Sequence, residues 1–194
     1  MSRLIRALLF MALLASCGSS NYSAPDELDD ACAILSDRPG FQRAFRAAER
    51  QWGVPVNVQM AIMYQESKFI ANARPPHRYA LGVIPWGRQS TAYGYSQALD
   101  ATWEEYQDLE GGRGARRDNI RDAADFMGWY MAETTATLGI AIDDTRRQYL
   151  AYHEGRTGYS RGSYNSKSWL VRIAGELERR AALYEAQLVA CGRA

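Results

Sequence analysis

Apolar residues recur along most of this chain every three or four positions, which is the spacing of one face of an α-helix. Ile120, Ala124, Met127 and Met131 follow this pattern, and Gly139 comes after them as a C-terminal stop signal. With Pro, Gly and Asp as boundary signals, the pattern predicts helices over 25–35, 39–51, 54–67, 100–109, 118–138, from 143 or 144 to just before 155, and from 166 nearly to the C-terminus. We therefore predict an all-α (predominantly helical) domain.

Two segments break the helical pattern. Residues 74–93 are rich in Pro, Gly and aromatic residues, and residues 155–165 are rich in Gly, Tyr and Ser. The first could carry one short β-hairpin around residues 80–86. Aromatic rings in these two segments could stack on a ligand, and packing in the core is the alternative role for them.

The segment 54–67 is apolar on nearly every face, unlike the other predicted helices. Pro55 suits the first turn of a helix, and too few polar residues follow it to make a solvated side, so we predict a buried helix. Glu66 lies near its end and shares a face with Ile62 and Met63. Apolar surroundings favour a protonated carboxyl group, which general acid catalysis requires. We interpret Glu66 as a candidate catalytic acid.

Residues 1–16 are organised like an export signal, with a short basic start and an apolar stretch too short to span a membrane. The stretch ends in Leu14-Ala15-Ser16-Cys17, which resembles the lipobox of bacterial lipoproteins. That resemblance implies that an acylated Cys17 becomes the first residue of the mature chain. The alternative is an ordinary signal peptide that contains a Cys by chance. Residues 17–24 would form a flexible tether and residues 25–194 a single domain.

The residue after the lipobox Cys gives an expectation for the location of the protein. Gly18 rather than Asp follows Cys17, which among lipoproteins usually implies the outer membrane of a Gram-negative bacterium. We therefore expect a periplasmic domain that is attached to the membrane through a lipid anchor.

The charge and histidine content exclude several classes of partner. The chain has 23 basic and 22 acidic residues, for a net charge of +1, so no strong field favours nucleic acid. The only two histidines form no metal-binding motif, so we predict no metal and no other cofactor. The sequence names no protein partner.

Two further cysteines fall on the apolar faces of predicted helices. Cys32 recurs with Leu28 and Leu35, and Cys191 continues the apolar face of the C-terminal helix, so we expect both thiols to point inward. In an oxidising compartment they can form a disulfide. Two buried free thiols are the alternative, because sequence does not reveal their distance.

Three short segments resemble, in order, the signature motifs of soluble-lytic-transglycosylase-type (SLT) catalytic domains. The motif E-S-x-F-x-x-x-A is matched by Glu66-Ser67-Lys68-Phe69-Ile70-Ala71-Asn72-Ala73. The second motif, G-L-M-Q followed by a hydrophobic residue and x-P-x-T-A, resembles Gly94-Tyr95-Ser96-Gln97-Ala98-Leu99-Asp100-Ala101-Thr102-Trp103. The third, A-Y-N-A-G, is similar to Ala151-Tyr152-His153-Glu154-Gly155. The resemblance covers residues 41–155 and implies a lysozyme-like fold.

This resemblance also implies an activity and a set of site residues. Glu66 would act as acid and then as base on the bond between N-acetylmuramic acid and N-acetylglucosamine in peptidoglycan, leaving a 1,6-anhydro sugar. Tyr152 would orient Glu66 or hydrogen-bond to it. The other residues that the resemblance places beside the substrate are Ser67, Gly94, Tyr95, Ser96, Gln97 and His153.

The chain departs from the family pattern at three places. Tyr95-Ser96 replaces an apolar pair, His153 replaces the usual Asn, and the stretch from Glu66 to Gly94 is longer than usual. These departures predict a divergent branch whose substrate groove has its own shape.

Two other functions fit the same sequence. One is a muramidase on the same fold, in which a second carboxylate such as Glu154 activates water. The other is a lipoprotein that binds peptidoglycan without cleaving it. The cleavage products distinguish the first alternative, and the effect of replacing Glu66 distinguishes the second.

Overall fold

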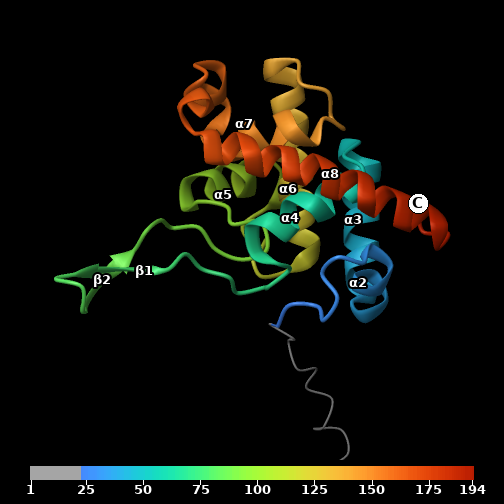
Figure 1. Ribbon diagram of the computed structural model, residues 1–194, viewed down its shortest axis with the longest axis horizontal. Coiled ribbons are helices and arrows are strands. Elements are labelled where there is room, and N and C mark those ends of the chain that lie inside the picture. Colours follow the sequence, from blue (N-terminus) through green and yellow to red (C-terminus); the bar gives the residue numbers. More distant parts are fainter. Residues whose placement is uncertain (1–22) are drawn as a thin grey trace, which may run out of the picture.

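The computed structural model describes residues 23–194, apart from the side chains of residues 80 and 85. Cys17 and the predicted boundary after residue 16 lie outside the described residues. In the described part the chain forms seven α-helices and one antiparallel hairpin (Figure 1). The elements are α2 (Ala31–Asp37), α3 (Pro39–Trp52), α4 (Val56–Ser67), β1 (His77–Ala80), β2 (Ile84–Arg88), α5 (Asp100–Tyr106), the π-helical turn η2 (Gln107–Gly111), α6 (Ile120–Leu138), α7 (Thr145–Ser160), the 3₁₀ turn η3 (Ser163–Ser166) and α8 (Ser168–Ala190). The predicted helical fold class is confirmed. None of the described helices is long and apolar enough to cross a membrane.

Helix α4 lies at the centre of the domain, where α3, α6, α7 and α8 pack against it. Eight of its 12 residues are buried, as the apolar pattern predicts. Gln59 is a buried polar residue of this helix, and its amide donates hydrogen bonds to the carbonyl groups of Phe45 (3.0 Å) and Val54 (2.8 Å). These bonds satisfy both hydrogens of the amide, and they tie α4 to the middle of α3 and to the turn that follows α3.

The surrounding helices are joined by apolar faces and a few polar links. Helix α8 crosses the domain and buries one stripe, made of Leu170, Ala174, Leu177, Ala181, Tyr184 and Leu188. On the opposite side, the carboxylate of Asp125 in α6 accepts hydrogen bonds from Trp52 Nε1 in α3 (2.8 Å) and from the Tyr106 hydroxyl in α5 (2.6 Å). This carboxylate therefore fixes three helices to one another.

A disulfide joins Cys32 in α2 to Cys191 just after α8, across 159 residues of sequence. Closing so long a loop stabilises a fold by roughly 2–5 kcal/mol. The expectation that both cysteines face inward is wrong, because Cys32 is only half-buried and Cys191 is exposed. Helix α8 ends at Ala190, so Cys191 leaves the helical register that the apolar pattern assumed.

Helix boundaries differ most from the prediction at the start of α2 and after Gly155. Helix α2 begins at Ala31 rather than at residue 25, because Asp30 caps it by accepting a hydrogen bond from the Ala33 N–H (3.0 Å). The predicted helix end before Gly155 coincides with a kink in α7, where this glycine has a non-helical φ of 71° and ψ of 154°. The difference is that a second helical segment follows the kink and continues to Ser160.

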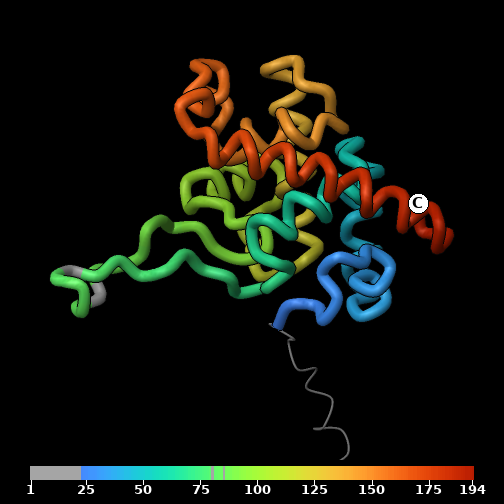
Figure 2. Tube along the Cα trace, viewed as in Figure 1, coloured from blue at the N-terminus to red at the C-terminus, as the bar shows by residue number. Residues whose placement is uncertain are grey.

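The predicted hairpin is present, and it stands away from the body of the protein on two arms (Figure 2). Its strands pair antiparallel, with Ala80 opposite Ile84, Tyr79 opposite Pro85 and His77 opposite Arg88. The register shifts between residues 77 and 79. The arms lead back to the end of α4 and to the loop before α5, where the candidate site lies.

Candidate active site

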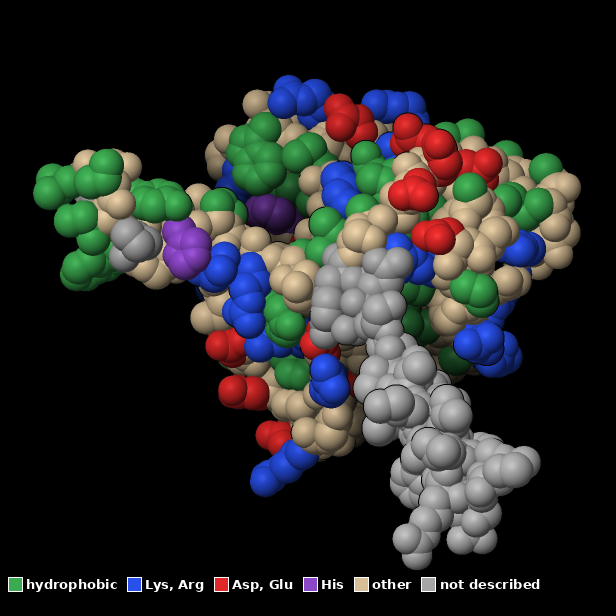
Figure 3. All heavy atoms as spheres, turned by 90° about the horizontal axis from the view of Figure 1, so that it is seen from below, with side chains coloured by type: hydrophobic (Ala, Val, Ile, Leu, Met, Phe, Trp, Pro, Cys, Tyr) green, Lys and Arg blue, Asp and Glu red, His purple; other side chains and the backbone are tan. Residues whose placement is uncertain are grey.

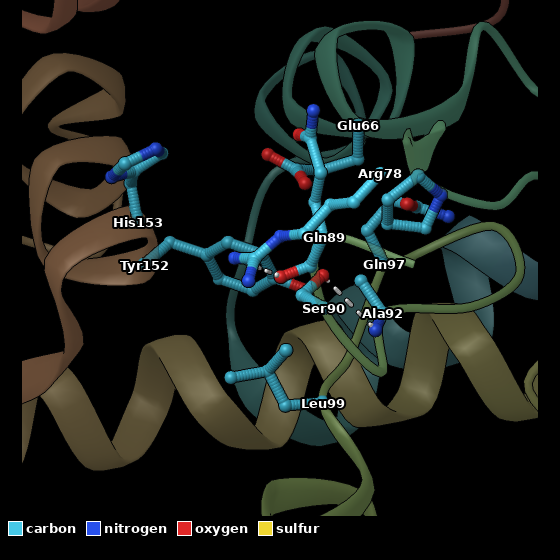
Figure 4. A pocket seen from close by; sticks show the side chains of 10 residues that line it. Glu66, Arg78, Gln89, Ser90, Ala92, Gln97, Leu99, Tyr152 and His153 are labelled. Carbon is cyan, nitrogen blue, oxygen red and sulfur yellow. Dashed lines mark hydrogen bonds between the residues drawn. The ribbon is translucent and has the colours of Figure 1, made fainter. Parts of the chain in front are cut away.

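A cavity of about 720 Å³ lies where the end of α4, the hairpin arms, the loop before α5 and the middle of α7 meet. Figure 4 shows Glu66 on one side of it, facing Tyr152 and His153 on the other. The lining residues are Glu66, Pro75, Arg78, Gln89, Ser90, Ala92, Gln97, Leu99, Tyr152 and His153. Four residues predicted from the sequence thus meet here: Glu66, Gln97, Tyr152 and His153.

Glu66 is placed by the way in which α4 ends. It lies in the last turn, and Lys68 and Phe69 follow with φ of 52° and 62°, in the left-handed region that non-glycine residues seldom adopt. Phe69 is buried, with its ring 5.9 Å from that of Phe41, so core packing holds this unfavourable turn in place. The sharp end of the helix leaves the Glu66 carboxyl group on the cavity wall.

The surroundings of Glu66 favour its protonated form. Burial raises the pKa of Glu66 to about 8, although the Lys68 ammonium and a hydrogen bond with Tyr149 act in the opposite direction. The position at the C-terminal end of α4 adds to the effect of burial, because the helix dipole disfavours negative charge there. Near neutral pH this carboxyl group holds a proton and can donate it.

The tyrosine whose hydroxyl hydrogen-bonds to Glu66 is Tyr149, whereas the resemblance implied Tyr152. Tyr149 is buried, and its hydroxyl hydrogen-bonds to the Glu66 carboxyl group. Tyr152 lines the cavity, but its hydroxyl donates to the carbonyl oxygen of Ser96 (2.6 Å). Tyr149 belongs to none of the three motifs, although it lies one helical turn before Tyr152 and so on the same face of α7.

Gly94 and Gln97 shape the loop opposite α7. The resemblance placed Gly94 beside the substrate, but a Cβ atom on Gly94 would lie 2.1 Å from the carbonyl oxygen of Arg117, so this glycine allows a close approach to protein backbone. Gln97 donates its amide to the carbonyl groups of Ala73 (3.0 Å) and Gly94 (2.8 Å). Because both amide hydrogens are used, Gln97 can offer a ligand its carbonyl oxygen.

Three other predicted substrate-binding residues do not line the cavity. The buried Ser67 hydroxyl donates to the carbonyl of Met63 (3.3 Å), within its own helix. The Tyr95 ring lies 5.6 Å from that of Phe41 and belongs to the core. Ser96 is fully buried and acts through its backbone carbonyl, which holds Tyr152. These three residues are buried behind the residues that line the cavity and help to hold them in place.

Part of the cavity wall comes from the long insertion between the first two motifs. Arg78 in β1, and Gln89 and Ser90 just after β2, face the cavity (Figure 4). These three residues could not be predicted as site residues, because no short-range sequence pattern connects them with Glu66. Only the path of the two arms brings them beside the carboxyl group.

A smaller cavity of about 200 Å³ adjoins the first and shares Gln97, Leu99, Tyr152 and His153 with it. Glu154 lies here, and its side chain is only 3% exposed. Burial by itself would raise the pKa of Glu154, but bonds with Lys167 (2.7 Å), Ser163 and His153 (3.0 Å) outweigh burial and lower the pKa to about 2. Glu154 is therefore an ionised carboxylate that is already paired.

Comparison with known proteins agrees with this geometry. Residues 5–191 match the family model described as transglycosylase SLT domain. Searches of curated proteins and of solved structures give no match. The family match spans nearly the whole chain, including all three motifs and the cavity that they surround. The chain therefore belongs to the transglycosylase SLT domain family and is a transglycosylase that acts on peptidoglycan.

Proposed function

We propose that the protein is a lytic transglycosylase that cleaves the β-1,4 bond between N-acetylmuramic acid and N-acetylglucosamine and leaves 1,6-anhydro-N-acetylmuramic acid ends. One observation carries this proposal: the cavity contains a carboxyl group, that of Glu66, whose raised pKa keeps it protonated near neutral pH. A proton donor beside a polysaccharide groove is what cleavage of a glycosidic bond requires.

In the proposed reaction, Glu66 gives its proton to the glycosidic oxygen while the bond from this oxygen to C1 of the muramic sugar breaks. The carbonyl oxygen of the sugar's own N-acetyl group stabilises the positive charge at C1. The Glu66 carboxylate then removes the proton of the 6-hydroxyl, whose oxygen bonds to C1. Glu66 is protonated again at the end, and no water is consumed. Tyr149 and Lys68 stabilise the carboxylate between the two steps.

The state of Glu154 favours this reaction over hydrolysis. Most inverting and retaining hydrolases use a second carboxylate that is free to activate water or to attack the sugar. The Glu154 carboxylate is buried and bonded to Lys167, Ser163 and His153. Among the described residues that line the main cavity, Glu66 is the only carboxylic acid.

Digestion of purified peptidoglycan sacculi, followed by mass spectrometry of the released muropeptides, tests the proposal. We expect anhydro-muramyl ends from the natural protein and from Glu154→Gln, and none from Glu66→Gln. Hydrated reducing ends would instead establish a muramidase. If Glu66→Gln turns over sacculi as fast as the natural protein does, the Glu66 mechanism is refuted; if both only bind them, the protein is a peptidoglycan-binding lipoprotein.

We also propose that Cys17 is acylated and holds the domain in the periplasm, at the outer membrane. The lipobox resemblance at residues 14–17 supports this proposal. Incorporation of labelled palmitate in cells, compared between the natural protein and Cys17→Ala, tests it. Labelling of the Cys17→Ala variant would show that Cys17 is not the acylated residue.

A further inference from the structure

The tip of the hairpin, residues 79–86, exposes more apolar side chain than a solvated loop requires. In the part of the tip whose side chains are described, Tyr79 is 59% exposed, Leu81 91%, Val83 76%, Ile84 52% and Trp86 76%. Figure 3 shows this tip standing clear of the body as a mostly hydrophobic projection. An exposed apolar patch of this kind marks an interaction site.

Both faces of the hairpin contribute to this apolar surface. Tyr79 pairs with Pro85, and Ile84 pairs with Ala80, so Tyr79 and Ile84 point to opposite faces because neighbouring residues of a strand alternate. Both side chains are more than half exposed. A protein partner docks against one face of a hairpin, whereas a lipid environment surrounds both.

Side-chain types along the hairpin follow the layers of a membrane surface. The aliphatic Leu81, Val83 and Ile84 are nearest the turn, and the aromatic Tyr79 and Trp86 come next. At the base of the tip stand Arg78 and Arg88, with a histidine (Figure 3). Hydrocarbon, the interface where Trp and Tyr gather, and the phosphate layer follow one another in the same order.

The segment that carries the hairpin has a charge complementary to an anionic surface. Residues 67–99 contain no Asp or Glu, although the chain as a whole has 22 acidic residues. The same segment has four basic residues, Lys68, Arg74, Arg78 and Arg88. Basic residues beside a membrane are attracted to anionic lipid head groups.

We propose that the hairpin tip inserts into the anionic surface of a lipid bilayer. From the aromatic residues to the turn the strands extend about 10 Å, at roughly 3.3 Å per residue, which reaches the boundary between head groups and acyl chains. The outer edges of a two-stranded hairpin have unpaired backbone groups, so the tip stays where water or head groups can satisfy them. Arg78 also lines the cavity, so insertion would fix the direction in which the cavity faces. The proposal does not depend on the reaction that Glu66 performs.

Trp86 reports directly on insertion. The full chain is bound to vesicles of phosphatidylethanolamine and phosphatidylglycerol whose acyl chains carry bromine, which quenches tryptophan fluorescence at short range. We expect the natural chain to be quenched and Trp86→Phe to lose at least half of that quenching. Trp169→Phe, which removes another exposed indole, is the matched control and should keep the quenching. The N-terminal segment is present in every variant, so any binding of this segment to the vesicles is the same for all of them.

A triple variant tests the aliphatic part of the tip without removing the reporter. Leu81→Asn, Val83→Ser and Ile84→Thr together should lower the quenching of Trp86 at least twofold, and Asn is chosen because residue 81 has a φ of 53°. All three side chains are at least half exposed, so the melting temperature should not change. Replacing phosphatidylglycerol by phosphatidylcholine should lower the quenching of Trp86, which is the part of the signal lost in Trp86→Phe, at least fivefold.

Three results would overturn the proposal. The first is a natural chain that floats with the anionic vesicles while Trp86 is not quenched. The second is equal quenching in neutral and anionic vesicles, which would exclude the anionic partner. The third is protection of Trp86 from the soluble quencher acrylamide by sacculi but not by vesicles, which would make the tip a glycan contact.

Discussion

Replacing Glu66 by Gln should abolish glycan cleavage and at the same time stabilise the fold. The amide has the shape of the protonated acid but cannot ionise. In the folded natural protein the pKa of Glu66 is about 8, against 4.5 for a solvated Glu. Between these values the unfolded chain has lost a proton that the folded chain still holds, so the natural protein loses stability as pH rises from about 4.5 to about 8. The Gln variant has no such loss.

The size of the gain follows from these two pKa values, because each pKa unit corresponds to about 1.4 kcal/mol. The variant should match the natural protein near pH 4, where Glu66 is protonated in both states. It should be more stable by about 3 kcal/mol at pH 7 and by about 5 kcal/mol at pH 9. Below pH 4.5 the effect vanishes, and above pH 8 it is constant.

Denaturant unfolding followed by circular dichroism, with the disulfide intact, measures this difference at the three pH values. Glu133→Gln, at an exposed position of α6, is the control and should show no such dependence on pH. A gain from Glu66→Gln that is the same at pH 4 and pH 9, or a loss of stability at pH 7, would refute the reasoning that burial holds the proton on Glu66.

Four further predictions concern the pH dependence of Glu66, its neighbour Tyr149, the ion pair of Glu154, and the disulfide. The rate at which sacculi are cleaved, measured as the loss of their turbidity, should fall as pH rises through about 8, since Glu66 must be protonated to act. Full activity at pH 10 would contradict this. Tyr149→Phe removes a hydrogen bond that favours the Glu66 carboxylate, so the alkaline limb of the same profile should move to higher pH. Lys167→Met leaves Glu154 buried without its cation and should lower the unfolding free energy by about 1–3 kcal/mol, whereas a double variant with Glu154→Gln should recover part of it. Reducing the Cys32–Cys191 disulfide should cost roughly 2–5 kcal/mol in the same measurement, and no change on reduction would show that the bond is absent in solution.

The helices could be predicted because their signals are local. Apolar spacing and caps such as Asp144 are properties of neighbouring residues, and they predicted the elements with small errors at their ends. The all-round apolar segment 54–67 predicted both a buried helix and an unusual carboxylate at its end. The reason is that burial depends on the composition of a segment, which the sequence displays directly.

The site was predicted only in part, because contacts between distant segments have no local signal. Nothing near Tyr149 indicates that it, rather than Tyr152, reaches Glu66. Glu154 could be read as a free second carboxylate until the fold placed Lys167 against it. Ser67 matches its motif and Tyr95 replaces an apolar residue of the next one, yet both side chains are buried away from the cavity.

The sequence by itself therefore determined the helical class, the family and the residue that holds the proton, because each depends on residue types at short spacing. Only the tertiary structure decided which groups surround that proton, and which of the other motif residues line the cavity. The physical reason is that desolvation and hydrogen bonding depend on distance in space, and α4, α7 and the hairpin arms meet only after the chain has folded.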